Sequence, residues 1–128
     1  MKQSTPVRAL LVDDEVGFVE VLRKRLGMRG IALTTAPGGT RAIQLLRESD
    51  FDVAILDVKM EDMDGIEVLR IFKKMVPDLP VILLTGHASE ETATEGLRHG
   101  ALDYLLKPCD LDTLLGKILE AARGHLEE

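Results

Sequence analysis

Four stretches of the chain place polar side chains directly after a short, largely apolar run. In chain order these side chains are Asp13 and Asp14 after residues 9–12, Asp57 after 53–56, Thr85 after 81–84 and Lys107 after 102–106. If each run is a strand of one parallel sheet, the strands end at the same edge, where ligands and chemistry collect in open α/β sheets. The sequence therefore predicts one site built from carboxylates, a hydroxyl and an ammonium group.

The carboxylates of Asp13, Asp14 and Asp57 indicate a divalent cation. Carboxylates that share a cleft repel one another unless a cation offsets their charge. Mg²⁺, or Mn²⁺ in its place, takes oxygen ligands and keeps water or phosphate oxygens in its remaining positions. We expect a metal site that awaits a phosphoryl group.

The other polar groups match the needs of a phosphoryl group. Thr85 would donate a hydrogen bond to a phosphoryl oxygen, and Lys107 would neutralise charge during transfer. Asp57 would be the nucleophile and form an aspartyl-phosphate. Each residue alone has a simpler explanation, as a helix cap, a turn residue or a solvated lysine. The shared site is favoured because those explanations require four independent coincidences at one end of a sheet.

The elements that must position these residues are read from the hydrophobic pattern. Strands are predicted at residues 7–12, 31–36, 52–56, 81–84 and 102–106. Helices are predicted at about 15–28, from about 42 to 48, from about 68 to 76, at about 89–99 and at about 111–122. This alternation predicts an α/β, doubly wound five-stranded parallel sheet covered by five helices.

Length and charge limit the class of protein. The 128 residues suffice for a single domain, 1–128, with a core at about 7–123 and a possible start of a linker at 124–128. The net charge of -6 argues against direct nucleic-acid binding by this domain. The single Cys109 cannot form an internal disulfide, and the sequence shows neither a signal region nor a membrane-spanning run. We expect a cytoplasmic domain without membrane contact.

Together the motifs resemble the receiver domain of two-component response regulators, the CheY-like superfamily. The matching segments are Val12-Asp13-Asp14-Glu15, Leu56-Asp57-Val58-Lys59-Met60, Met63-Asp64-Gly65, Leu84-Thr85-Gly86 and Tyr104-Leu105-Leu106-Lys107-Pro108. The resemblance covers essentially the whole chain and implies a flavodoxin-like fold with strand order 2-1-3-4-5. One departure is Glu61, where receivers commonly carry Pro.

The resemblance also implies roles for individual residues. Asp57 would take a phosphoryl group from a sensor histidine kinase or a histidine phosphotransfer protein. Asp14, Asp57 and the backbone carbonyl of Lys59 would hold Mg²⁺ or Mn²⁺, with Asp13 acting largely through water. The remaining implied roles are a cis peptide before Pro108, structural glycines at Gly65 and Gly86, and tuning of the phosphoryl lifetime by Lys59 and His87.

Such a domain would be a switch that assists its own phosphorylation rather than a dedicated enzyme. Thr85 would move toward the phosphoryl group and Tyr104 would swing inward behind it. This would remodel the face formed by helix 89–99, strand 102–106 and the last helix, because the helix at 89–99 has mainly Ala93 and Leu97 as apolar anchors. The face would control an output domain or partner, and phosphorylation-dependent homodimerisation is one form this could take.

Three other functions stay open on sequence alone. A phosphatase of the haloacid dehalogenase type also uses an aspartate after a parallel strand. That class resembles an Asp-x-Asp motif at this point, whereas this chain has Asp57-Val58-Lys59, with Lys in place of the second Asp. A flavodoxin-like cofactor carrier would need a first loop rich in Gly, Ser or Thr, which Asp13-Asp14-Glu15 does not provide. A phosphorylation-independent receiver-like scaffold is disfavoured by the complete set of site residues.

Overall fold

The computed structural model describes residues 6–86 and 90–126, and it confirms the predicted doubly wound fold. The strands are β1 (Val7–Val12), β2 (Ile31–Ala36), β3 (Val53–Asp57), β4 (Val81–Thr85) and β5 (Asp103–Leu106). They form a five-stranded sheet in the order β2-β1-β3-β4-β5, with every neighbouring pair parallel. The helices are α1 (Val16–Gly27), α2 (Gly39–Glu48), α3 (Gly65–Met75), α4 (Glu90–Arg98) and α5 (Leu111–Leu126).

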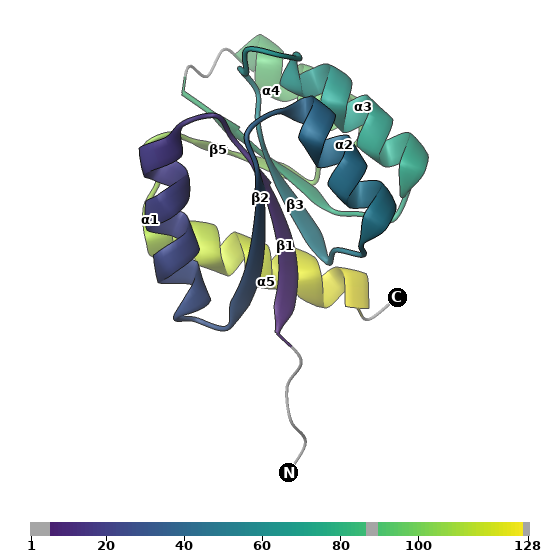
Figure 1. The fold of residues 1–128 in the computed structure, drawn as a ribbon. Helices are drawn as coiled ribbons and strands as arrows, with labels where there is room; N and C mark the ends of the chain where they lie inside the picture. Colours follow the sequence, from purple (N-terminus) through teal and green to yellow (C-terminus); the bar gives the residue numbers. More distant parts are fainter. Residues whose placement is uncertain (1–5, 87–89, 127–128) are drawn as a thin grey trace.

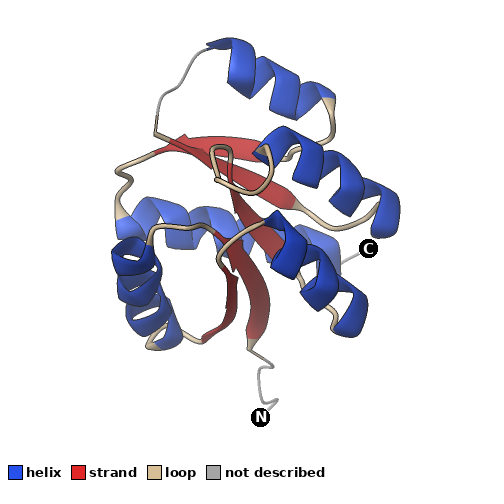
Figure 2. Cartoon of the chain, turned by 45° about the horizontal axis from the view of Figure 1, so that its top comes forward, coloured by secondary structure: helices blue, strands red, loops and turns tan. Residues whose placement is uncertain are grey.

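Helices cover both faces of the sheet (Figures 1 and 2). The central strand β3 shows why its sequence is apolar throughout. Val53 and Ile55 pack in the core under α1 and α5, whereas Ala54 and Leu56 pack in the core under α2 and α3. Successive side chains of a strand point to opposite faces, so a strand buried on both sides needs consecutive apolar residues.

The last two helices differ from the sequence prediction in detail. α5 continues to Leu126, although its apolar stripe ends near Ala122. A single Gly124 in this turn costs about 1 kcal/mol relative to Ala and does not by itself end a helix. On α4 the predicted anchor Leu97 was wrong, because its side chain is 47% exposed.

The helix α4 instead approaches the sheet through small residues. Ala93 is buried, and a Cβ on Gly96 would overlap the Cδ1 atom of Leu83 on β4. Gly96 therefore permits a close approach of α4 to β4. The amphipathic pattern does not predict this contact, because a glycine within a helical segment indicates only a weaker helix.

The connection from β3 to α3 is held by backbone contacts. The N–H of Gly65 donates to the carbonyl of Val58 at 2.8 Å, and Lys59 and Asp64 form an isolated antiparallel bridge. Asp64 caps α3 by accepting a hydrogen bond from the N–H of Ile66 at 3.2 Å. A Cβ on Gly65 would overlap the backbone oxygen of Asp57 and lie 2.6 Å from the Cα of Val58. Glycine is thus required sterically beside Asp57.

The Gly65→Ala variant should therefore lose about 1–3 kcal/mol of folding free energy, because its new methyl group meets backbone that cannot move aside cheaply. Gly116→Ala on α5 is the matched control, since a Cβ there meets nothing within 4 Å. It should gain about 0.5–1 kcal/mol from the entropy of the unfolded chain. Urea unfolding measures both, and equal midpoints for the two variants would contradict the steric role of Gly65.

Candidate functional site

The predicted carboxylates meet at the carboxyl edge of the sheet. β1 and β3 are neighbours in which Val12 pairs with Leu56, so Asp13 and Asp57 follow at the same level. Ligand oxygens of Asp13, Asp14 and Asp57 all lie within 4.8 Å of one another. Asp13 is 1% exposed and Asp57 5% exposed. Two acidic groups are thus buried side by side.

Lys107 from the loop after β5 provides a positive charge for this cluster. Its Nζ atom lies 2.7 Å from Oδ2 of Asp13 and 3.4 Å from Oδ2 of Asp57. The same ammonium contacts Oε1 of Glu15 at 2.5 Å and lies 4.7 Å from the centre of the Phe18 ring. Neither Glu15 nor Phe18 is among the site residues that the sequence predicts.

Burial and charge act in opposite directions on the site. Burial raises the pKa of Asp57, the negative charge of Asp13 raises it further, and Lys107 offsets part of the rise. Burial also lowers the pKa of Lys107, but its short contacts with Asp13 and Glu15 outweigh burial and raise that pKa overall. Lys107 is therefore a cation, and one ammonium is shared among several carboxylates.

The donor set fits a divalent cation. Oδ2 of Asp13 is buried, and among the described residues it has an ionic contact with Lys107 but no hydrogen bond of good geometry. The cluster supplies hard carboxylate oxygens, as Mg²⁺ requires, and the side chain of Asp14 is only half-buried. A cation bound there would offset the negative charge that Lys107 alone does not neutralise.

Two further predicted residues adjoin the cluster through their backbone. The N–H of Lys59 donates to Oδ1 of Asp57 at 3.3 Å, while the Lys59 side chain is exposed. Thr85 is buried at the end of β4, and its carbonyl accepts a hydrogen bond from the N–H of Lys107 at 2.8 Å. Thr85 shares the side-chain alternation of Val81 and Leu83, which pack under α2 and α3.

The remaining predicted residues lie farther out or outside the described chain. Tyr104 on β5 is 36% exposed, and the peptide bond between Lys107 and Pro108 is cis. A Cβ on Gly86 would meet nothing within 4 Å, so the described residues give no steric reason for a glycine there. His87, and Ser89 at the predicted start of α4, lie outside the described residues.

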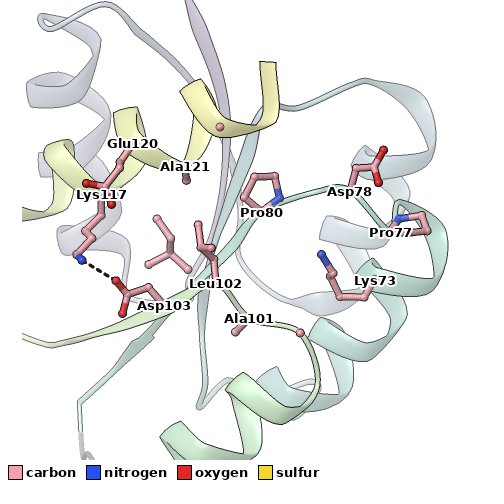
Figure 3. A pocket seen from close by; sticks show the side chains of 13 residues that line it. Lys73, Pro77, Asp78, Pro80, Ala101, Leu102, Asp103, Lys117, Glu120 and Ala121 are labelled. Atoms are coloured by element: carbon pink, nitrogen blue, oxygen red, sulfur yellow. Dashed lines mark ion pairs between the residues drawn. The ribbon is translucent and has the colours of Figure 1, made fainter. Parts of the chain in front are cut away.

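A cavity of about 640 Å³ is located at the other edge of the sheet. Figure 3 shows Pro80 and Leu102, which precede β4 and β5, facing Ala121 of α5. An ion pair of 2.6 Å between Lys117 and Asp103 borders it. None of the clustered carboxylates lines this cavity, so it is separate from the candidate site.

Within residues 6–86 and 90–126, no helix combines the length and the apolar character needed to cross a bilayer.

Known proteins resemble this chain in both sequence and structure. The chain is 40% identical over 123 residues, 95% of its length, to the transcriptional regulatory protein ZraR of Klebsiella oxytoca, of which this covers 28%. It is 37% identical over 113 residues, 88% of its length, to the luminescence regulatory protein LuxO of Vibrio campbellii, of which this covers 25%. The chain thus spans about a quarter of the length of these curated relatives.

Among solved structures, a CheY-like response regulator receiver domain protein from Methanospirillum hungatei superposes with a TM-score of 0.91 at 30% identity, covering 95% of this chain and 98% of that one. A sequence model of the response regulator receiver domain matches residues 9–119. The fold, the acidic edge and these matches agree, and the chain belongs to the response regulator receiver domain family of signalling switches.

Proposed function

We propose that the chain is a phosphorylation-activated switch in which Asp57 accepts a phosphoryl group from a sensor histidine kinase or a histidine phosphotransfer protein. The observation that carries the proposal is the contact of a buried Asp57 with Lys107 inside a cluster of carboxylates. In the transfer, a carboxylate oxygen of Asp57 forms a bond to phosphorus. The bond from phosphorus to the donor nitrogen breaks, and its electron pair stays with the donor histidine.

A divalent cation belongs to this proposal because the carboxylates need one. Asp14, Asp57 and the backbone carbonyl of Lys59 would hold Mg²⁺ or Mn²⁺ directly, with Asp13 acting largely through water. When bound, the cation neutralises charge on the phosphoryl oxygens. The contact of Lys107 with both Asp13 and Asp57 supports its role as the second source of positive charge.

The other residues would act after or around the transfer. Thr85 would donate a hydrogen bond from its hydroxyl to a phosphoryl oxygen, and it would move toward the phosphoryl group to do so. Lys59 is exposed two residues beyond Asp57, which supports a role in the lifetime of the phosphoryl group, and the same role is proposed for His87.

The output is proposed to pass through the face of α4, β5 and α5. Half-exposed apolar side chains on this face, Leu97, Leu102 and Leu106, support a surface that another domain or molecule covers. Relatives are named as transcriptional regulators, so an output domain or partner that controls transcription is proposed, with homodimerisation as one route. The charge of -6 supports nucleic-acid contact outside this domain, and a cytoplasmic location remains a prediction.

The phosphoacceptor role is tested by incubating the protein with Mg²⁺ and acetyl phosphate and following its intact mass. One base-labile phosphoryl adduct is expected on the wild type and on Asp50→Asn, which alters an exposed carboxylate, and none on Asp57→Asn. An adduct that persists in Asp57→Asn would overturn the assignment. If the wild type shows no adduct, the experiment is repeated with a phosphorylated histidine kinase, and failure there also overturns it. Rapid hydrolysis of diverse phosphate esters would instead favour the dehalogenase-type phosphatase.

The raised pKa of Asp57 predicts that replacing this carboxylate by a neutral side chain increases folding stability, by an amount that depends on pH. The folded protein binds this proton more tightly than the unfolded chain, so stability contributed by Asp57 is lost as pH rises through the raised pKa. Without metal at neutral pH, Asp57→Asn should therefore raise the urea midpoint, and the gain should shrink toward about pH 4. Asp50→Asn is the control, and a gain independent of pH would contradict this reasoning.

The same measurement tests the cation. Mg²⁺ at ten times its dissociation constant should stabilise the wild type by about 1.4 kcal/mol. Asp57→Asn should gain less, because one of the ligands has lost its charge. Equal stabilisation of both proteins would place the metal elsewhere.

The proposed switch predicts a specific effect of Tyr104. Phosphorylation should change amide hydrogen exchange in α4, β5 and α5 of the wild type. In Tyr104→Ala the change in exchange should be much smaller. The phosphoryl adduct should still form, because Tyr104 takes no part in the transfer itself. A variant whose two forms still differ as much as those of the wild type would argue against Tyr104 as part of the switch.

A further inference from the structure

The loop between β3 and α3 caps the N-terminus of α2. The capping residue, Asp62, lies 23 residues after Gly39, the first residue of that helix. Oδ1 of Asp62 accepts a hydrogen bond from the N–H of Gly39 at 3.0 Å, and Oδ2 accepts one from the N–H of Thr40 at 3.1 Å. The residue at the N-cap of α2 is Gly38, which offers no side-chain hydrogen bond. Asp62 therefore supplies from another loop the cap that α2 lacks locally.

The packing around this cap is close. A Cβ on Gly38 would lie 2.5 Å from Oδ1 of Asp62, and a Cβ on Gly39 would lie 2.8 Å from the sulfur of Met63. The two glycines leave space that the loop occupies. Hydrogen bonds from the backbone N–H groups of Thr40 and Gly39 lower the pKa of the exposed Asp62, so the cap is a carboxylate.

The residue before Asp62 contacts the acidic cluster itself. The N–H of Glu61 donates to Oδ2 of Asp14 at 3.3 Å. A proline at position 61 would have no N–H and could not make this bond. With one oxygen of Asp14 held by the loop, the orientation of the carboxylate is set and its other oxygen remains available to a cation.

We propose that Asp62 is a positioning residue that raises the divalent-cation affinity of the Asp13, Asp14 and Asp57 cluster. By fastening the loop to the start of α2, Asp62 holds the Glu61 N–H on Asp14. The cation then binds a cluster that is already ordered instead of ordering the loop itself. This inference rests on the metal site of the proposed function.

The experiment titrates metal-free protein with Mn²⁺ and follows the free ion by electron paramagnetic resonance, so that no phosphorylation is required. Asp62→Ala should bind Mn²⁺ about 10-fold more weakly than the wild type. Asp62→Asn should recover part of the loss, because its amide oxygen still accepts one of the two hydrogen bonds.

Asp110→Ala is the matched control for the loss of a helix cap. The Oδ2 atom of Asp110 accepts a hydrogen bond from the N–H of Thr113 at the start of α5, and the residue is exposed. This variant should lose comparable stability in urea and keep the wild-type affinity for Mn²⁺. Equal weakening in Asp62→Ala and Asp110→Ala would reduce Asp62 to a structural residue and overturn the proposal.

A second pair of variants isolates the backbone contact. Glu61→Pro removes both the N–H and the side-chain charge, whereas Glu61→Gln removes only the charge. Weaker Mn²⁺ binding by Glu61→Pro than by Glu61→Gln is expected, and equal affinities would contradict the role of the Glu61 N–H. If the wild type binds no Mn²⁺, the metal site of the proposed function fails as well. If the wild type binds and Asp62→Ala binds equally well, only the role of Asp62 fails.

Discussion

The burial of Asp13 and Asp57 at the ends of adjacent strands is the constraint on which the site depends. Carboxylates taken out of water lose hydration energy, and two of them side by side also repel each other. Lys107 offsets part of this cost through its contacts with both residues. The site therefore carries excess negative charge, which favours the binding of a cation among its carboxylates.

The topology of the sheet produces this crowding. A crossover through β2 and α2 returns the chain so that β1 and β3 are neighbours, although they are far apart in sequence. At the other end of the same two strands, a guanidinium nitrogen of Arg8 contacts Asp52 at 3.0 Å, and the N–H of Arg8 donates to Asp52 at 2.9 Å. Asp52 is only 2% exposed. These contacts hold the register of β1 against β3, and that register sets Asp13 level with Asp57.

The two sides of the site are held differently. Toward α2, the loop after β3 is fastened by the Asp62 carboxylate, by the Gly65 N–H and by the bridge of Lys59 with Asp64. Toward α4, the described contacts with the sheet involve Ala93 and Gly96, which bury little apolar area. A region with few buried apolar contacts opens at lower free energy than the core. This asymmetry supports the proposal that the loop after β3 stays fixed while α4 moves.

Much of the fold follows from local pattern. Consecutive apolar residues such as Val53 to Leu56 require a strand buried on both faces, and the alternation of such strands with amphipathic helices requires a doubly wound sheet. The polar residues that end the strands could be named as candidate site residues before any coordinates, since parallel strands end at one edge. Contacts that join distant loops have no such signal. Neither the capping of α2 by Asp62 nor the contact of Glu15 with Lys107 follows from a periodicity.

The sequence by itself determined the sheet, its order through the family resemblance, and the types of chemical group at its edge, because these depend on short-range periodicity and motif spacing. Only the tertiary structure decided which groups touch. Lys107 lies against Asp13 and Asp57, and its own N–H donates to the carbonyl of Thr85, because the loop after β5 packs against the carboxyl ends of β1, β3 and β4. The physical reason is that a hydrogen bond or an ion pair between loops depends on distances that the whole packed sheet sets, and no local stretch of chain encodes them.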